Sequence, residues 1–283
     1  MTLVGRRLTA EAFRWGRAAS GAVQRAMDPP SSWSLRVEAP SKRQVSKNGM
    51  HWVFLGCPGV GKGTYASRLA SLLSIPHIAM GDLVRQELSQ PSEASKKLIY
   101  AMSQGKLLPD QVVVSLLSTR LEKGALEGEK GFILDGFPRN TTQAEILEQV
   151  TEIDLVVNLK LREDVVISKC LGRRICSQCK GNFNVANIDV EGSDGGPRIS
   201  MPPLLPPPSC ATKMTIRADD TEEVVRERLR IYAEESKPVE DFYRLRGNLF
   251  DFEVAGGIPE TWPRLLDALN LSEKDCTHQK VSV

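Results

Sequence analysis

The chain has 283 residues, of which 41% are hydrophobic and 25% are charged, a balance typical of folded globular proteins. No apolar run approaches the length of a membrane span, so we expect no membrane partner. The net charge is +2, but residues 1–50 carry +6 and the remainder therefore carries −4. A mildly acidic body argues against a nucleic-acid partner, because a polyanion needs concentrated basic groups. Six cysteines are too sparse for a disulfide-stapled secreted domain, so a reducing compartment is expected.

Residues 1–48 have the composition of an import presequence followed by a linker. Arginine is abundant and acidic residues are few, and one face of a helix would carry Leu8, Ala12, Trp15, Ala19 and Val23. We expect delivery to a mitochondrion, with a chloroplast as the alternative, and a tail without any address is the competing interpretation. A Pro-Pro-Ser-Ser run at 29–32 and polar residues up to 48 indicate a linker. The folded domain is therefore placed at 49–283.

The strongest signal is the stretch from Gly56 to Thr64, Gly-Cys-Pro-Gly-Val-Gly-Lys-Gly-Thr, which follows an apolar run at 52–55. Glycines let several backbone N–H groups approach one polyphosphate. A helix that starts near Lys62 would direct its free N–H groups and its dipole at the same phosphates. Lys62 adds a full charge, and Thr64 is the hydroxyl candidate for a Mg²⁺ shell. The alternative is a glycine-rich turn without a ligand, which the strand pattern before it and the helix pattern after it disfavour.

Alternating strand and helix patterns continue along the chain. In order, we expect a strand at 75–78, a helix capped by Asp82, helices at 96–102 and 112–121, a strand at 132–135, a helix through Gln143, a strand at 154–159, a helix through 165–170, a helix starting after Asp219, a strand at 249–254 and a helix at 260–269. This order predicts a parallel three-layer α/β fold. Between 176 and 215, Gly, Asn and Pro replace the pattern and indicate an inserted lobe.

Two charged residues at and after the end of the strand at 132–135 are candidates for the site. Asp135 ends the strand, where a carboxylate beside the phosphate loop would hold Mg²⁺ and its waters together with Thr64. Arg139 lies four residues later and is expected to meet a second anion. A site of this kind would position two phosphate-bearing molecules rather than attack either of them covalently.

Five motifs, in this order, resemble adenylate kinases, most closely the long-lid organellar type of plants. They are Gly59-Val60-Gly61-Lys62-Gly63-Thr64, Gly81-Asp82 with Arg85, Asp135-Gly136-Phe137-Pro138-Arg139 with Gln143, Gly172-Arg173-Arg174, and Arg217-Ala218-Asp219-Asp220 with Arg228. The resemblance spans about residues 52–269. It implies a P-loop nucleoside monophosphate kinase fold, a lobe over the monophosphate at about 79–108, and a lid over ATP at about 172–220.

The resemblance also implies an activity and its residues. The expected reaction is Mg²⁺-dependent and reversible, ATP + AMP = 2 ADP, in a monomer whose partners are ATP, AMP and ADP. The catalytic residues implied are Lys62, Arg139, Arg173, Arg217 and Arg228. ATP would contact Gly59, Val60, Gly61, Lys62, Gly63, Thr64, Arg173, Asn182 and Phe183. AMP would contact Met80, Arg85, Lys106, Leu107, Leu108, Gly136, Phe137, Pro138, Arg139, Gln143, Arg217 and Arg228.

The chain departs from the family pattern at several positions. Met80 replaces the usual Thr near the adenine of AMP, Lys169 replaces an Arg and loses its bidentate fork, and the stretch 255–258 lacks the usual Asp-Gly. In the lid, Cys176, Cys179 and Cys210 resemble a zinc site, but the fourth position is Lys213, which is no zinc ligand. We therefore expect a metal-free lid with reduced thiols, rather than a lid with structural zinc or a disulfide.

Two other functions stay open from sequence. A pyrimidine monophosphate kinase is compatible with Met80, whereas Gln143 favours adenine because its amide both donates and accepts. A nucleotide-binding regulator without turnover is the other alternative, and the intact lysine and arginines disfavour it.

Overall fold

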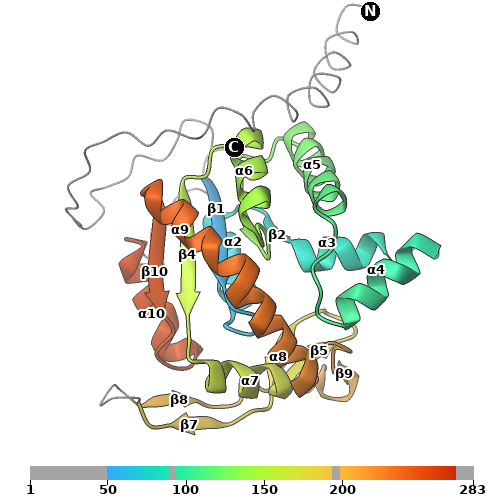
Figure 1. The fold of residues 1–283 in the computed structure, drawn as a ribbon. Helices are drawn as coiled ribbons and strands as arrows, with labels where there is room; N and C mark the ends of the chain where they lie inside the picture. The colour runs from blue at the N-terminus through green and yellow to red at the C-terminus, as the bar shows by residue number, and fades with distance from the viewer. Residues whose placement is uncertain (1–49, 89–92, 193–197, 272–283) are drawn as a thin grey trace, which may run out of the picture. The chain divides into compact units, whose positions relative to one another are not determined.

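The computed structural model describes residues 50–88, 93–192 and 198–271. Its centre is a five-stranded sheet in the order β10-β4-β1-β3-β2 (Figure 1). The strands are β1 (Met50–Gly56), β2 (His77–Ala79), β3 (Gly131–Asp135), β4 (Leu155–Lys160) and β10 (Leu249–Glu253). All neighbouring pairs are parallel, so the predicted α/β fold with a central parallel sheet is confirmed. The predicted presequence and linker at 1–48 lie outside the described residues.

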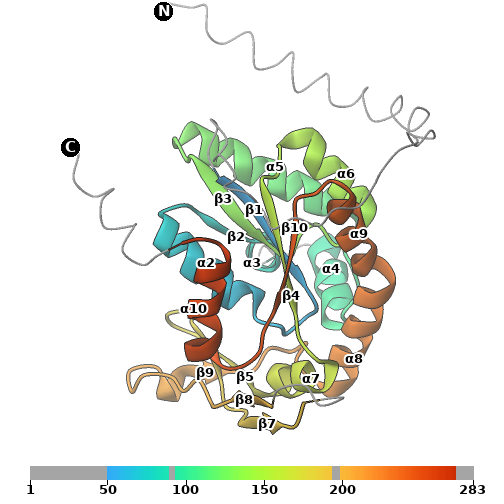
Figure 2. The same ribbon diagram turned by 90° about the vertical axis from the view of Figure 1, so that its left-hand side faces the viewer.

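Helices cover both faces of this sheet (Figure 2). One face carries α2 (Lys62–Leu73) and α10 (Ile258–Ala268), and the other carries α5 (Asp110–Leu126), α6 (Thr141–Val150) and α9 (Lys237–Leu245). The remaining helices are α3 (Met80–Glu87), α4 (Glu93–Ser103), α7 (Glu163–Gly172) and α8 (Glu222–Ile231), and a π-helical turn (Tyr232–Ser236) joins α8 to α9. Within the described ranges, every helix is too short or too polar to span a lipid bilayer.

The apolar run in β1 is continuous because its side chains serve two cores. Side chains alternate between the faces of a strand, and Val53 and Leu55 pack with α5, α6 and α9, whereas Phe54 packs with α2 and α10. Val53 and Phe54 have no exposed surface. A parallel sheet between two helical layers has no side facing water, and burial of each such side chain contributes about 1.5–3 kcal/mol. The strand is thereby fixed, and with it the loop that follows.

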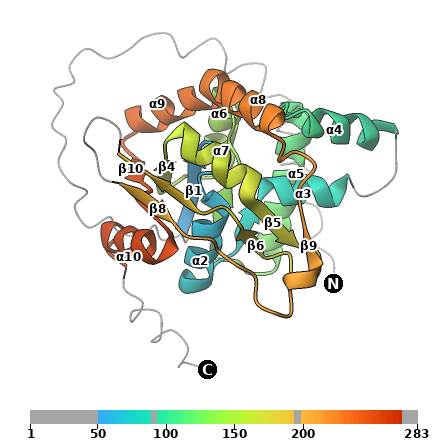
Figure 3. The same cartoon turned by 90° about the horizontal axis from the view of Figure 1, so that it is seen from below.

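Beyond the carboxyl ends of the parallel strands, residues 173–215 form two small antiparallel sheets (Figure 3). One contains β5 (Arg173–Cys176) between β6 (Asn182–Asn184) and β9 (Met214–Thr215), and the other pairs β7 (Ile188–Val190) with β8 (Ile199–Met201). This region keeps its own hydrogen-bonded pairs and adds no strand to the central sheet.

Two sequence expectations need correction. The second strand runs from His77 to Ala79 rather than over 75–78, because Pro76 has no N–H for a ladder and only its carbonyl takes part, accepting from Ile133 N–H at 2.8 Å. Asp82 does not cap a helix: α3 starts at Met80, and Asp82 lies inside its first turn. The helix starts earlier because Met80 and Val84, one turn apart, bury the same face.

Candidate active site

The loop between β1 and α2 has the geometry of a phosphate cradle. Gly59 and Gly61 have φ values of 86° and 117°, which only glycine adopts without strain. A Cβ on Gly59 would also lie 2.3 Å from Cys170 Sγ, so α7 packs directly against the loop. Gly61 is the N-cap residue of α2. Thr64 N–H donates to Gly61 O at 3.0 Å, whereas the N–H groups that open the helix, at Lys62 and Gly63, lie where a helix N-terminus can bind a phosphate.

Lys62 opens α2 and turns its side chain back over this loop. Its Nζ donates to the carbonyl oxygens of Gly56 at 2.6 Å and Cys57 at 2.9 Å. Desolvation is the main cause that lowers the pKa of Lys62; the charge of Asp135 opposes this shift, and the weaker effects of Arg139 and Arg228 add to it. The hydrogen-bond partners of the ammonium are neutral carbonyls in a desolvated place, an arrangement that a bound anion would stabilise.

Asp135 lies directly beside the phosphate loop. The parallel register pairs Phe54 of β1 with Asp135 of β3, and a Cβ on Gly63 would come within 3.1 Å of Asp135 Oδ2. Glycine at 63 therefore leaves the space that the carboxylate occupies, next to Thr64. Carboxylate and hydroxyl oxygens are the hard ligands that Mg²⁺ prefers, so these residues fit the predicted ion. The His77 ring, which no motif indicated, lies 3.8 Å from the same carboxylate.

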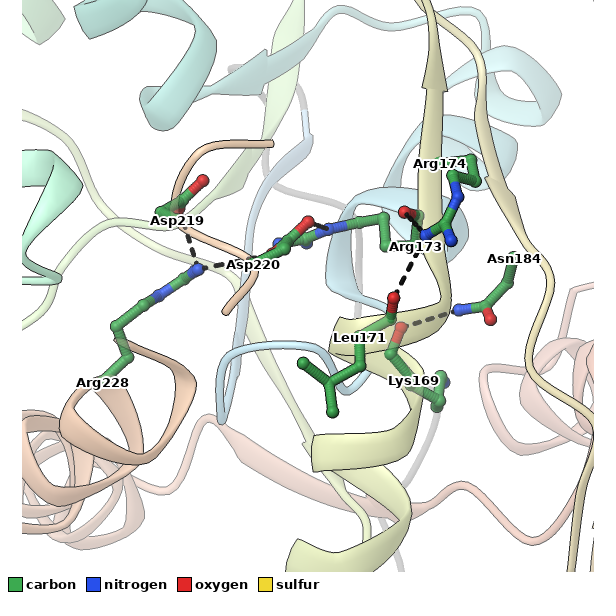
Figure 4. A network of polar contacts seen from close by, with 8 residues as sticks. All are labelled: Lys169, Leu171, Arg173, Arg174, Asn184, Asp219, Asp220 and Arg228. Carbon is green, nitrogen blue, oxygen red and sulfur yellow. Dashed lines mark hydrogen bonds and ion pairs between the residues drawn. The ribbon is translucent and has the colours of Figure 1, made fainter. Parts of the chain in front are cut away.

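Two of the predicted arginines, Arg173 and Arg228, meet two neighbouring aspartates (Figure 4). Arg173 donates from Nε to Asp220 Oδ2 at 2.8 Å and from Nη2 to Oδ1. Arg228 of α8 donates to Asp219 at 2.9 Å and lies 3.9 Å from Asp220. The Asp220 side chain has no exposed surface, so this is a buried ion pair with both carboxylate oxygens engaged. A third, Arg217, belongs to the same segment, and its carbonyl accepts from Asp220 N–H at 3.1 Å.

Positive charge accumulates between the phosphate loop and this aspartate pair. Desolvation comes first among the causes that lower the pKa of Arg139 to about 10, followed by the charge of Arg228. Desolvation and then Arg173 lower the pKa of Arg217 to about 10. Arg139 keeps a water-accessible surface, so its cleft is open to ligand. Cations that depress one another's pKa in one place form a site for a polyanion.

A narrow cavity of about 40 Å³ collects most of the residues predicted for AMP. Its lining comprises Met80, Gly81, Val84, Met102, Lys106, Leu107, Leu108, Val113, Gly136, Arg139 and Gln143. Ligand pockets usually measure about 300–1,000 Å³, so a nucleotide would fit only after the walls move apart. A larger hollow of about 690 Å³, at the end of α2 near Ser74, contains none of the predicted residues.

Gln143 is buried, and its amide is held in one orientation. Its Oε1 accepts from Arg139 N–H at 2.8 Å, and its Nε2 donates to Asp110 Oδ1 at 2.7 Å. A primary amide has two acceptor lone pairs and two donor hydrogens. One of each therefore stays available for a base in the cavity.

The other predicted AMP residues have different surroundings. Arg85 is half exposed and pairs with Asp82 at 2.6 Å, whereas Phe137 and Pro138 are buried in the turn after β3. Met80 is 2% exposed and belongs to the core packed on α5 and α6. Met80 thus combines cavity wall and core packing, which explains how an apolar side chain is accommodated there.

Besides Arg173 on β5, the residues predicted for ATP outside the loop lie on β6. Asn182 is exposed and Phe183 is partly buried, and β6 pairs with β5 so that Phe183 lies opposite Arg174 and Asn184 opposite Arg173. The structure therefore brings Phe183 close to the arginine strand and leaves Asn182 at the solvent edge.

Three further contacts support the site and were not predicted from sequence. Asp110 orients Gln143, as described above. Asn184 Nδ2 donates to the carbonyl of Lys169 at 2.8 Å and fixes the junction of α7 with β5 (Figure 4). Lys169 Nζ donates to Val60 O in the phosphate loop at 2.9 Å, and desolvation lowers the pKa of Lys169 to about 8.

Comparison with known proteins assigns this geometry to a family. The adenylate kinase family model matches residues 54–248. The chain is 63% identical over 230 residues to "Probable adenylate kinase 6, chloroplastic" of Oryza sativa subsp. japonica, covering 81% of each chain. It is 61% identical over 235 residues to "Adenylate kinase 1, chloroplastic" of Arabidopsis thaliana (83% of this chain, 81% of the relative), and 57% identical over 258 residues to "Adenylate kinase" of Solanum tuberosum (91% and 88%).

Proposed function

Because the chain belongs to the adenylate kinase family, we propose that it catalyses the reversible phosphoryl transfer ATP + AMP = 2 ADP. The observation that carries the proposal is the convergence of Lys62, Arg139 and Arg228 on one cleft, since their charges act on one another's pKa. Transfer between two nucleotides brings two polyanions together, and a cluster of positioned cations offsets their repulsion.

The phosphate loop and the arginines divide this work. Backbone N–H groups from Gly59 to Thr64 bind the phosphates of ATP, and Lys62 exchanges its carbonyl partners for phosphate oxygens. Arg139 binds the phosphate of AMP on the opposite side. Arg173 and Arg228, held by the aspartate pair, with Arg217 beside them, stabilise the charge on the group in transfer. Positioning and charge suffice because no covalent intermediate is needed.

Thr64 and Asp135 would hold Mg²⁺, partly through water. The ion supplies positive charge that neutralises the phosphate oxygens during transfer. Asp135 is suited to this task because Gly63 leaves its carboxylate free of side-chain contact on the loop side.

Two segments close over the ligands in this proposal, the monophosphate lobe at about 79–108 and the lid at about 172–220. Closure excludes water, which would otherwise accept the phosphoryl group. The small cavity supports it, because AMP could enter only if the lobe opened. Gly105 of this lobe packs against α8, the helix that carries Arg228: a Cβ on Gly105 would lie 2.7 Å from Arg228 Cγ. Movement of the lobe is therefore coupled to Arg228, one of the residues proposed to stabilise the group in transfer.

Adenine recognition depends on Gln143, whose remaining donor and acceptor match the base. The relatives reported above carry the adenylate kinase name, which lends no support to the pyrimidine alternative. Met80 contributes apolar contact in place of a hydroxyl.

We also propose the chloroplast as the destination, with the Arg-rich residues 1–48 as its presequence. Two of the three relatives above are named chloroplastic, which favours this over the mitochondrion. Parallel import of the radiolabelled chain into isolated chloroplasts and mitochondria tests it, and processing by mitochondria alone would reverse the assignment.

The activity is tested by ADP formation from Mg-ATP with AMP, CMP, UMP or GMP as the acceptor. We expect a strong preference for AMP. Lys62→Met should lower turnover by about 10²–10³-fold or more, the loss typical of a removed charge-stabilising donor. Lys123→Met, at an exposed position on α5, is the matched control and should retain activity. Turnover that survives Lys62→Met would refute the role of the loop, and ATP binding without turnover on any acceptor would favour the regulator.

A further inference from the structure

Three cysteines outside the transfer site come together in the antiparallel sheet. The Sγ atoms of Cys176, Cys179 and Cys210 all lie within 4.8 Å of one another, and Cys179 Sγ is 3.6 Å from Cys210 Sγ. Cys176 ends β5, Cys179 lies in the turn that follows, and Cys210 immediately precedes the short 3₁₀ turn Ala211–Lys213. Segments 31 residues apart thus hold their thiols face to face.

This group does not supply a complete zinc site. Structural zinc takes four N, S or O ligands, and among the described residues the cluster contains three sulfurs and no carboxylate or imidazole. Lys213, which stands where a fourth ligand would, directs its Nζ to Gln178 Oε1 instead. A backbone hydrogen bond also joins the two segments that carry the cysteines, since Ser177 N–H donates to Lys213 O at 2.8 Å.

We propose that Cys179 and Cys210 form a reversible disulfide by exchange with a small-molecule disulfide. Cys179 is exposed, whereas Cys176 and Cys210 are buried, with 0% and 7% exposure. Of these three thiols, Cys179 is therefore the one that can meet an external disulfide. Its partner is Cys210, whose Sγ lies 3.6 Å away, so the two sulfurs need to approach by only about 1.5 Å to reach bonding distance.

The exchange balances in two steps. The Cys179 thiolate attacks an external disulfide RSSR, which forms the mixed disulfide Cys179–S–S–R and releases one RS⁻. Cys210 then gives up its proton to water, its thiolate attacks Cys179 Sγ, and the second RS⁻ leaves; the two protons released by Cys179 and Cys210 pass through water to the two RS⁻. Two protein thiols lose two electrons and two protons, and RSSR becomes two RSH.

The disulfide would join the β5–β6 turn to the segment before β9, two parts of the same sheet. A cross-link across this loop restricts the unfolded chain and so stabilises the folded segment. The site therefore stiffens residues 173–215 under oxidising conditions without tying them to the central sheet.

The test uses the full chain, purified with reductant and chelator and then equilibrated in glutathione buffers from reduced to oxidised. Free thiols are counted, and disulfides are mapped by mass spectrometry after alkylation. We expect the oxidised chain to lose two of its six thiols, with Cys179 linked to Cys210, and its melting temperature to rise.

Three variants make the assignment decisive. Cys179→Ser changes only an exposed side chain, so it should fold, keep its other thiols and show no rise in melting temperature. Cys176→Ser should still form the disulfide, and Cys276→Ser, outside the described residues, is the control that should behave as the parent. A different mapped pair, unchanged thiol loss in Cys179→Ser, or one zinc that survives the chelator and blocks oxidation would overturn the proposal.

Discussion

Replacement of Asp220 by Asn tests how much the buried ion pair stabilises the site. The Asp220 side chain is completely buried and accepts two bonds from Arg173, whose side chain is only 17% exposed. Asn has nearly the same shape, but it has no charge and would turn an N–H group toward the guanidinium. Arg173 would then keep its charge in a cleft that already contains Arg217 and Arg228.

The expected loss is large because one charge stays buried without its partner. Removal of one member of a buried pair typically costs about 3–5 kcal/mol, a substantial share of the roughly 5–15 kcal/mol that a domain has. For a chain of this size, the melting temperature should fall by on the order of 10 °C. Turnover should fall as well, since Arg173 loses the contact that orients it.

Asp189→Asn is the matched control. Asp189 also accepts two bonds, from Arg198, but both side chains are largely exposed at 44% and 59%. Water and salt screen such a pair, so urea unfolding of Asp189→Asn should match the parent within error. If Asp220→Asn unfolded at the same urea concentration as Asp189→Asn, burial would not increase the stabilisation that the Arg173–Asp220 pair provides, and the expected loss would be refuted.

Other contacts give sharp expectations. Gly59→Ala should destabilise the chain more than Gly128→Ala in urea unfolding. Both glycines have positive φ (86° and 80°), so both variants carry left-handed strain of about 1–2 kcal/mol, but only at 59 would a Cβ meet another atom, which adds overpacking of about 1–3 kcal/mol. Equal losses would contradict this packing. Asp110→Ala should raise KM for AMP and leave KM for ATP unchanged, because Asp110 orients Gln143; a parallel rise in both would refute the assignment. The pKa of Lys169 is about 8 in the folded chain against an ordinary 10.5, so the unfolded chain binds more protons between these two pH values. The free energy of unfolding of the parent should therefore rise relative to that of Lys169→Gln as the pH increases from about 8 to 10.5. A difference in unfolding free energy that stays constant with pH would disprove this.

The elements that could be predicted from sequence depend on residues close together in the chain. Strand β3 has apolar residues at consecutive positions because both of its faces are covered, and the glycines of the phosphate loop are required by local φ and by close packing. The prediction of Asp82 as a cap failed for a local reason too. An acidic residue suits both a cap and the first helical turn, and burial of Met80 decided between them.

Contacts between distant segments could not be found this way. Asp110 meets Gln143 across 33 residues, and Lys169 meets Val60 across 109. Neither contact follows from sequence spacing, although the family pattern singles out Lys169 itself. The parallel sheet, which brings α7 against the phosphate loop and α5 beside α6, places the partners together. A resemblance names the residues that contact ligand, whereas those that orient them follow from the fold.

The cation cluster leads us to expect that this cleft prefers ligands that carry negative charge. Desolvation first, and then the charge of Arg228 or Arg173, lowers the pKa of Arg139 and Arg217, so part of the repulsion among the cations persists although Asp219 and Asp220 pair with Arg228 and Arg173. A ligand that carries phosphates removes this repulsion when it binds, whereas a neutral nucleoside with the same base does not. We therefore expect the phosphates to supply most of the binding free energy, because they relieve this repulsion, and the amide of Gln143 to add selectivity for the base.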